Sequence, residues 1–109
     1  MGEGELEDLG RYSGPATLIL ASLASGSKHG YALTKDVEEF AGVHLAPGTL
    51  YGALSRLVDQ GFIAPVATDD ERRRPYRITP AGTEALRKQL SEQRRVADVG
   101  LRRLKKAVT

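Results

Sequence analysis

Two helices are predicted by the first hydrophobic stretches of the chain. Residues 15–24 are apolar nearly all round, which is typical of a helix buried in the core. Residues 30–40 are amphipathic, because Leu33, Val37 and Phe40 recur at i, i+4 and i+7 and share one face. Both segments follow a helix-start signal and end at a glycine, so we expect two short helices here.

A third helix is predicted from Thr49 to about Gln60, after the turn Ala46-Pro47-Gly48. Its leucines repeat with helical spacing and form the buried stripe: Leu50, Leu54 and Leu57. The opposite face is small, polar or charged: Thr49, Gly52, Ser55, Arg56 and Asp59. Gly61 supplies the C-terminal cap. This helix therefore presents a polar face to solvent.

The period then changes from helical to alternating. Residues 62–66 and 75–79 predict two short antiparallel strands with a tip at residues 69–71. Tyr76 and Ile78 share one face of the second strand. Pro65 has no N–H to donate, so we expect the first strand at an edge of the sheet.

A long amphipathic helix is predicted to run from Thr79-Pro80 towards Val108. Its apolar stripe comprises Leu86, Leu90, Ala97, Leu101, Leu104 and Val108, with Gln93 as the one polar member. Such a helix spans roughly 40 Å, more than a small domain covers. A second copy is the simplest partner for the remaining stripe, so we expect a homodimer; a solvated single helix is the alternative.

Three helices, a hairpin and a long helix give a mainly α fold with a small β-hairpin. This order is typical of a winged helix-turn-helix followed by a C-terminal dimerisation helix. We divide the chain into an acidic N-terminal tail (1–13), the winged helix-turn-helix DNA-binding domain (14–80) and the dimerisation helix (81–109).

Composition narrows the possible functions. The chain of 109 residues has no cysteine, which excludes disulfides and thiolate metal sites. The two histidines, His29 and His44, lie in different elements without a convergent set of ligands. No apolar run approaches the roughly 20 residues of a membrane span, and no secretory signal is present, so we expect a cytoplasmic protein. We expect no active site, metal or cofactor.

The charge distribution is compatible with a polyanionic partner. The net charge is +2, but residues 1–13 carry −3, residues 14–80 are neutral and residues 81–109 carry +5. A dense basic cluster lies beside the hairpin tip: Arg72, Arg73 and Arg74. In a helix-turn-helix the second helix enters the major groove of DNA, so the polar face of residues 49–60 is the candidate reading surface. A winged-helix protein-interaction module without specific DNA binding is the alternative.

The candidate DNA contacts come from three places. Lys28 and His29, just before the second helix, can take a phosphate. Thr49, Ser55 and Arg56 can read base edges, and Tyr51 can hydrogen-bond a phosphate oxygen. The three wing arginines can reach the neighbouring minor groove or the DNA backbone.

Four segments together resemble the PadR family of bacterial transcriptional regulators: HGYAL (29–33), PGTLYGALSRL (47–57), QGFI (60–63) and RRRPYRITPAG (72–82). The resemblance covers about residues 15–90 and is closest to the short subgroup with one C-terminal helix. It implies a dimeric winged-helix repressor that binds DNA and releases it on binding a small molecule. By position it also implies roles for Tyr31 and Lys35 in the supporting helix.

Two departures from the family pattern affect these expectations. Gly52 stands where the family often has proline, and the chain has no Trp on which an aromatic drug could stack. The aliphatic stripe of the last helix therefore favours a small apolar effector. We expect a double-stranded, inverted-repeat operator, and a nucleoid-associated protein when it is bound there.

Overall fold

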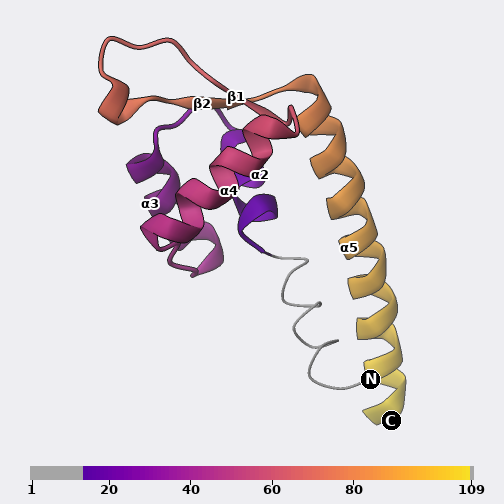
Figure 1. Ribbon diagram of the computed structural model, residues 1–109. Coiled ribbons are helices and arrows are strands. Elements are labelled where there is room, and N and C mark those ends of the chain that lie inside the picture. The colour runs from indigo at the N-terminus through magenta and orange to yellow at the C-terminus, as the bar shows by residue number, and fades with distance from the viewer. Residues whose placement is uncertain (1–13, 109) are drawn as a thin grey trace.

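The computed structural model describes residues 14–108, and its elements follow the predicted order (Figure 1). They are α2 (Pro15–Leu23), α3 (Gly30–Ala41), α4 (Pro47–Asp59), β1 (Ile63–Pro65), the 3-10 helix η1 (Glu71–Arg73), β2 (Tyr76–Ile78) and α5 (Pro80–Val108). The mainly helical fold with a two-stranded hairpin and a long last helix is thus confirmed. The acidic tail predicted for residues 1–13 lies outside the described residues.

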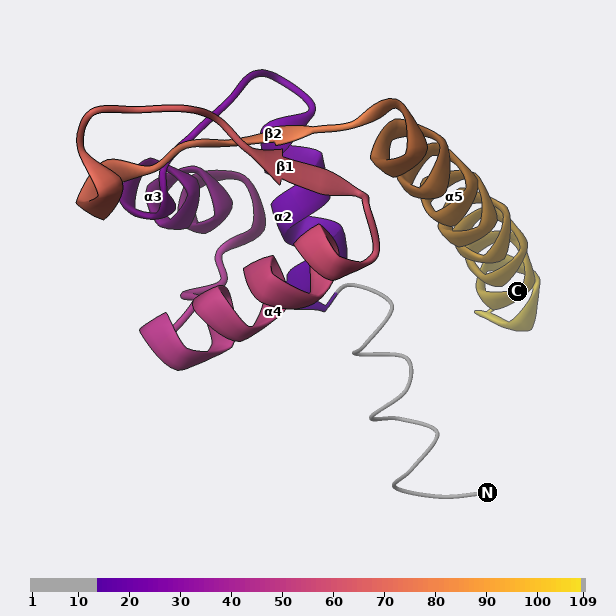
Figure 2. The ribbon, with the colours of Figure 1, turned by 45° about the horizontal axis from the view of Figure 1, so that its top comes forward.

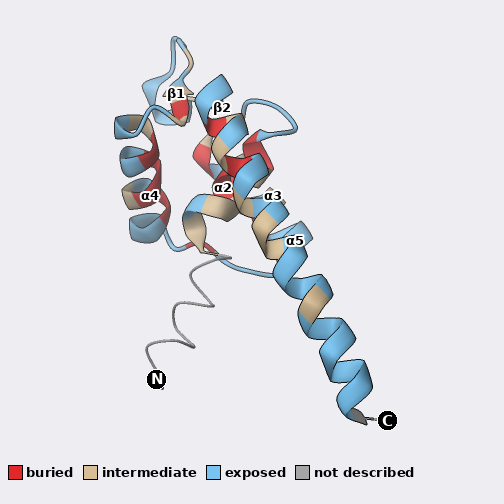
Figure 3. Cartoon of the chain, turned by 90° about the vertical axis from the view of Figure 1, so that its right-hand side faces the viewer, coloured by how far each residue is buried: buried red, intermediate tan, exposed pale blue. Residues whose placement is uncertain are grey.

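Helix α2 lies at the centre of the domain and packs against α3, α4, β2 and the start of α5. Its side chains Ile19 and Leu23 are buried together with Leu33 of α3, Leu54 of α4 and Ile63 of β1. Figure 3 shows the buried side of α4 facing the centre of the domain, while its outer side is exposed. Burial of aliphatic side chains at about 25 cal/mol per Å² stabilises this arrangement.

The ends of α3 and α4 differ slightly from the sequence prediction. Phe40 was expected on the buried face of α3, but its side chain is 51% exposed. Leu45, in the loop after α3, is instead buried in the core. Helix α4 begins at Pro47 rather than Thr49, because proline at the first helical position has a φ already suited to a helix.

The hairpin is a narrow antiparallel sheet in which Ala64 pairs with Arg77 and Pro65 with Tyr76. Backbone hydrogen bonds continue beyond the strands, from Val66 N–H to the Pro75 carbonyl at 2.8 Å and from Thr79 N–H to the Phe62 carbonyl at 3.0 Å. Strand β1 is at an edge of the sheet, as Pro65 predicted, since β2 also pairs on its other side with Lys28.

A close backbone approach fixes the start of α5. The Thr79 hydroxyl accepts the Gly82 N–H at 3.0 Å and donates to the Gly61 carbonyl at 2.6 Å, so Thr79 caps the helix. A Cβ at residue 82 would lie 2.0 Å from the Phe62 carbonyl oxygen. Only glycine lets the first turn of α5 pack this closely against the chain that leads into β1.

Helix α5 has 29 residues and therefore extends about 43 Å. It runs away from the domain, and Figures 1 and 2 show its C-terminal part distant from α3 and α4. Leu90, Leu101 and Leu104 are 42%, 67% and 64% exposed. Despite its length α5 is too polar to cross a membrane, and no other helix among residues 14–108 could do so either.

Leu86 corrects one expectation about α5. It was predicted in the dimer interface but is only 6% exposed and belongs to the core of its own domain. The reason is that the first turns of α5 pack on α2. The side chain of Val108, another predicted interface residue, lies outside the described residues.

Candidate nucleic-acid interface

Helix α4 separates an apolar face from a polar one. Leu50, Ala53, Leu54 and Leu57 are buried against the core. The predicted contact residues therefore point to solvent, and all four are exposed: Thr49, Tyr51, Ser55 and Arg56. A helix with this exposed polar face has the form required of a helix that enters the major groove.

The loop that joins β1 to β2, residues 66–75, is the wing of the winged helix. A hollow of about 770 Å³ lies between α3, α4 and this wing. The predicted site residues in its lining are His29, Tyr31, Lys35, Tyr51, Arg72 and Arg73. Figure 2 shows how the segments that carry these residues are arranged: the hairpin arches over α2 and α3, and its loop lies beside α3. Residues from three separate segments of the sequence thus line one surface.

Gly30 allows α3 and α4 to approach closely at this hollow. A Cβ at residue 30 would lie 3.0 Å from the Tyr51 hydroxyl and 3.4 Å from a methyl group of Leu50. The glycine of the HGY segment therefore makes room for the tyrosine of the TLY segment. The HGY and TLY segments are thus linked by direct packing of Gly30 against Tyr51.

The start of α3 is an ordered cluster of aromatic and basic side chains. His29 Nδ1 accepts the Ala32 N–H at 3.3 Å and so caps the helix. The His29 and Tyr31 rings stack with centroids 6.5 Å apart, and Lys35 Nζ lies 5.7 Å from the Tyr31 ring centroid. Tyr31 is nevertheless 70% exposed, so its phenol can reach a ligand.

A second hollow, of about 290 Å³, lies between α4 and the sheet. Its lining includes the predicted residues Tyr51, Ser55 and Arg74, and Tyr51 lines both hollows. Arg74 Nη2 lies 3.5 Å from Glu71 Oε1, which neutralises part of its charge. The two hollows thus flank α4 on the side of the wing.

The wing tip is held by its own acidic residue. The Asp70 carboxylate accepts the Arg72 N–H at 3.0 Å, and the Asp70 carbonyl accepts the Arg73 N–H at 3.0 Å. Within residues 14–108 neither Arg72 nor Arg73 takes part in an ion pair, and both side chains are exposed. Their guanidinium groups are available to a polyanion.

Lys28 was predicted to contact phosphate, but the structure turns its side chain inward. The ammonium lies 2.5 Å from the Ser22 carbonyl and 2.8 Å from the Ser25 hydroxyl, and the side chain is only 19% exposed. The cause is the free carbonyl end of α2, which attracts a cation. Lys28 is therefore removed from the candidate contacts.

Sequence reasoning did not place two acidic residues, Asp36 and Glu39, at this surface, where they line the first hollow. Asp59, which the sequence placed on the polar face of α4, lines the second hollow. The i, i+4 spacing of Lys35 and Glu39 could have placed Glu39 next to the predicted contacts. These carboxylates restrict the basic surface to the start of α3 and the wing tip. Among the described residues, no three His, Asp or Glu side chains are grouped so that they could hold a metal ion.

Comparison with known proteins identifies the family. The model of the PadR-like family of transcriptional regulators matches residues 19–88. The chain belongs to this family. This family consists of transcriptional regulators rather than enzymes, and the expected family and fold are confirmed.

Individual relatives agree with this assignment. The chain is 40% identical over 80 residues to a 37.1 kDa protein of a Streptomyces fradiae transposon, covering 73% of this chain and 23% of that protein. It is also 40% identical over 70 residues to the transcriptional regulator Rv3488 of Mycobacterium tuberculosis, covering 62% of this chain and 64% of that one. The chain thus spans less than two thirds of both.

Two solved structures are similar over most of their length. A transcriptional regulator from Clostridium thermocellum aligns with a TM-score of 0.73 at 29% identity, covering 84% of this chain and 93% of that one. A PadR family regulator from Clostridium difficile aligns with a TM-score of 0.73 at 28% identity, covering 82% and 96%. The fold described above is therefore that of known PadR-like regulators.

Proposed function

We propose that this PadR-like protein is a homodimeric repressor that binds an inverted-repeat operator in double-stranded DNA. One observation carries the proposal: the exposed polar face of α4 lies beside the arginine wing tip and the aromatic, basic start of α3. Residues that can contact base edges and residues that can bind phosphate therefore lie on the same side of the domain. A regulator of this kind acts at the nucleoid.

The contacts divide by chemistry. Thr49, Ser55 and Arg56 on α4 read base edges in the major groove, at about 1–3 kcal/mol for each well-formed bidentate pair. Phosphate contacts come from residues that line the first hollow and carry hydroxyl, imidazole or cationic groups: His29, Tyr31, Lys35, Tyr51, Arg72 and Arg73. Arg74 supports the wing from the second hollow.

The remaining part of α5 supplies the dimer contact. Leu90, Leu101 and Leu104 form an exposed apolar stripe on a helix that carries basic residues on its other side. Ala97 and Gln93 lie within the same stripe by helical spacing. A second copy would bury this stripe and set the two α4 helices about 34 Å apart, one turn of DNA. Residues 14–80 then act as the DNA-binding domain and residues 81–109 as the dimerisation helix.

The dimer interface is also the proposed effector site. Its aliphatic side chains favour a small apolar ligand. A ligand seated between the two α5 helices would change their angle and so the spacing of the α4 helices. To release DNA it must favour one spacing over the other, typically by 1–3 kcal/mol.

Selection from a library of random duplexes tests the proposal. The expected product is an inverted repeat whose half-sites are centred about 10 base pairs apart. If no sequence is enriched while the protein still binds an acidic protein surface, the domain is an interaction module and the repressor proposal fails. Sedimentation of the complex with the enriched duplex should show two chains per duplex.

A further inference from the structure

Lys28 connects the wing to the helix-turn-helix through its backbone. Its N–H donates to the Tyr76 carbonyl at 3.1 Å, and its carbonyl accepts the Tyr76 N–H at 2.9 Å. The N–H and the carbonyl of Tyr76 are both directed to Lys28. The pairing of Tyr76 with Pro65 of β1 therefore needs no N–H from the proline. Strand β2 is therefore attached to the loop before α3 by this one residue.

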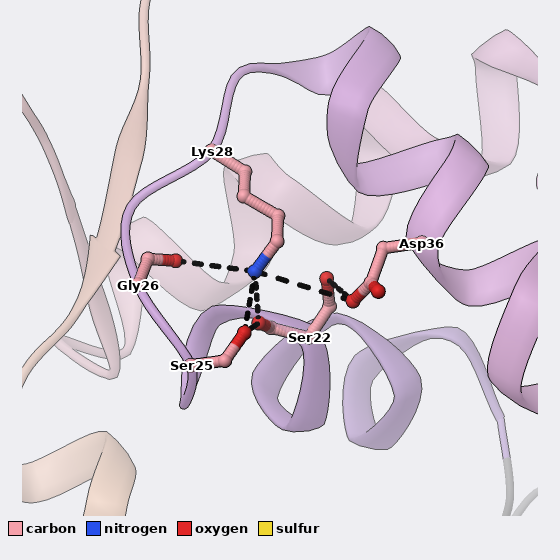
Figure 4. A network of polar contacts seen from close by, with 5 residues as sticks. All are labelled: Ser22, Ser25, Gly26, Lys28 and Asp36. Atoms are coloured by element: carbon pink, nitrogen blue, oxygen red, sulfur yellow. Dashed lines mark hydrogen bonds and ion pairs between the residues drawn. The ribbon is translucent and has the colours of Figure 1, made fainter.

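The side chain of Lys28 connects the same point to α2 and α3. Figure 4 shows its ammonium among the Ser22 carbonyl at 2.5 Å, the Ser25 hydroxyl at 2.8 Å, the Gly26 carbonyl at 3.4 Å and Asp36 Oδ2 at 4.0 Å. The Ser22 hydroxyl, which is buried, donates to the same Asp36 oxygen at 2.6 Å. An ammonium has three N–H donors, so these oxygens leave none for DNA.

The backbone and side-chain contacts of Lys28 form a joint between β2, α2 and α3. This joint lies between the groups that we propose to contact DNA. Lys28 directly precedes His29, which caps α3, and Tyr76 follows the wing arginines by two residues. Asp36 belongs both to the network around Lys28 and to the lining of the hollow that holds Tyr31 and Arg73. A shift of the joint would therefore move the wing relative to the start of α3.

From this geometry we infer that Lys28 is a positioning residue for DNA binding: it holds the wing at the helix-turn-helix without touching DNA. The inference rests on the proposed function, because the wing must contact DNA for its position to matter. A lysine that contacts phosphate adds a charge to the interface, whereas a positioning lysine acts only through the groups it holds. Loss of a phosphate contact reduces the salt dependence of DNA binding. Loss of a positioning residue instead changes the cost of substituting the DNA contacts that it positions.

A double-mutant cycle on DNA affinity separates the two roles. Lys28→Met keeps the apolar stem and removes the ammonium, and Lys35→Met is the matched change at an exposed lysine of the hollow. We expect Lys28→Met to weaken operator binding without changing the slope of log K against log salt, while Lys35→Met reduces the slope by about 2 per dimer. Arg73→Ala should then cost at least about threefold less in the Lys28→Met background than in the wild type.

Two results would overturn the inference. A reduced salt slope for Lys28→Met would make Lys28 a phosphate contact. Equal costs of Arg73→Ala in both backgrounds would leave Lys28 a merely structural residue. If Lys28→Met fails to fold, Ser25→Ala removes one partner of the ammonium and should show the same coupling to a smaller degree.

Hydrogen exchange in the free protein tests the joint without DNA. Lys28→Met should speed exchange of the Tyr76 amide and of the wing, residues 66–75, while the amides of α4 keep their rates. Unchanged exchange in the wing would contradict the positioning role. Absence of wild-type DNA binding, together with faster wing exchange in the variant, would count against the proposed function and not against the joint.

Discussion

Gly82→Ala is expected to destabilise the protein, although alanine favours helices. The added Cβ would lie 2.0 Å from the Phe62 carbonyl oxygen and 3.0 Å from Ile78 Cγ1. A tolerated carbon-to-oxygen contact is about 3.3 Å or more, so the start of α5 must move by roughly 1.3 Å. The first contact is with backbone, which cannot rotate away as a side chain can.

The magnitude follows from what that movement breaks. The Phe62 carbonyl also accepts the Thr79 N–H at 3.0 Å, and losing this hydrogen bond costs about 1 kcal/mol. Overpacking adds about 1–3 kcal/mol, and the helix preference of alanine returns up to about 1 kcal/mol. The net loss is about 2 kcal/mol, which lowers the melting temperature by roughly 10 °C.

The matched control is Gly52→Ala in α4. There a new Cβ meets only the flexible end of Arg56, at 3.7 Å, so the helix preference should raise stability by up to about 1 kcal/mol. Thermal unfolding of both variants, followed by circular dichroism at one protein concentration, measures the difference. A Gly82→Ala variant as stable as the wild type would refute the close approach at the start of α5.

Three further predictions concern DNA and the dimer. Arg73→Ala should weaken binding to all duplexes about equally and reduce the salt slope by about 2 per dimer; a changed base preference with an unchanged slope would contradict this role. Arg56→Ala should relax discrimination between operator and mutated sites by about 1–3 kcal/mol in competition assays, and retained discrimination would rule out base reading by this residue. Leu101→Ala should shift sedimentation towards monomer while leaving the domain folded, whereas Leu86→Ala should cost about 2–5 kcal/mol of domain stability. A Leu101→Ala protein that stays dimeric would place the interface elsewhere.

The fold could be predicted because each element carries a strong local signal. Leu50, Leu54 and Leu57 fix both the existence of α4 and the direction of its polar face. Thr79 and Pro80 mark the start of α5 within one residue. These signals depend on neighbours in sequence, and tertiary packing reinforces them.

The errors arose where an orientation depends on distant groups. Lys28 in a polar loop is typical of an exposed cation, and its inward orientation depends on the free carbonyls of α2 and on Asp36. Leu86 and Leu101 belong to one helical stripe, and periodicity cannot tell burial in the same chain from burial against a partner. Phe40 lost its expected core position while Leu45 from the following loop is buried.

The central claim is that the surface formed by α4, the start of α3 and the wing binds operator DNA. Fluorescence anisotropy of the wild-type protein with a labelled duplex from upstream of its own gene tests it most directly, at several salt concentrations and with excess random competitor. If a dimer neutralises about eight phosphates, binding should survive the competitor and weaken with salt at a slope near −7. No binding to any duplex at low salt would contradict the claim.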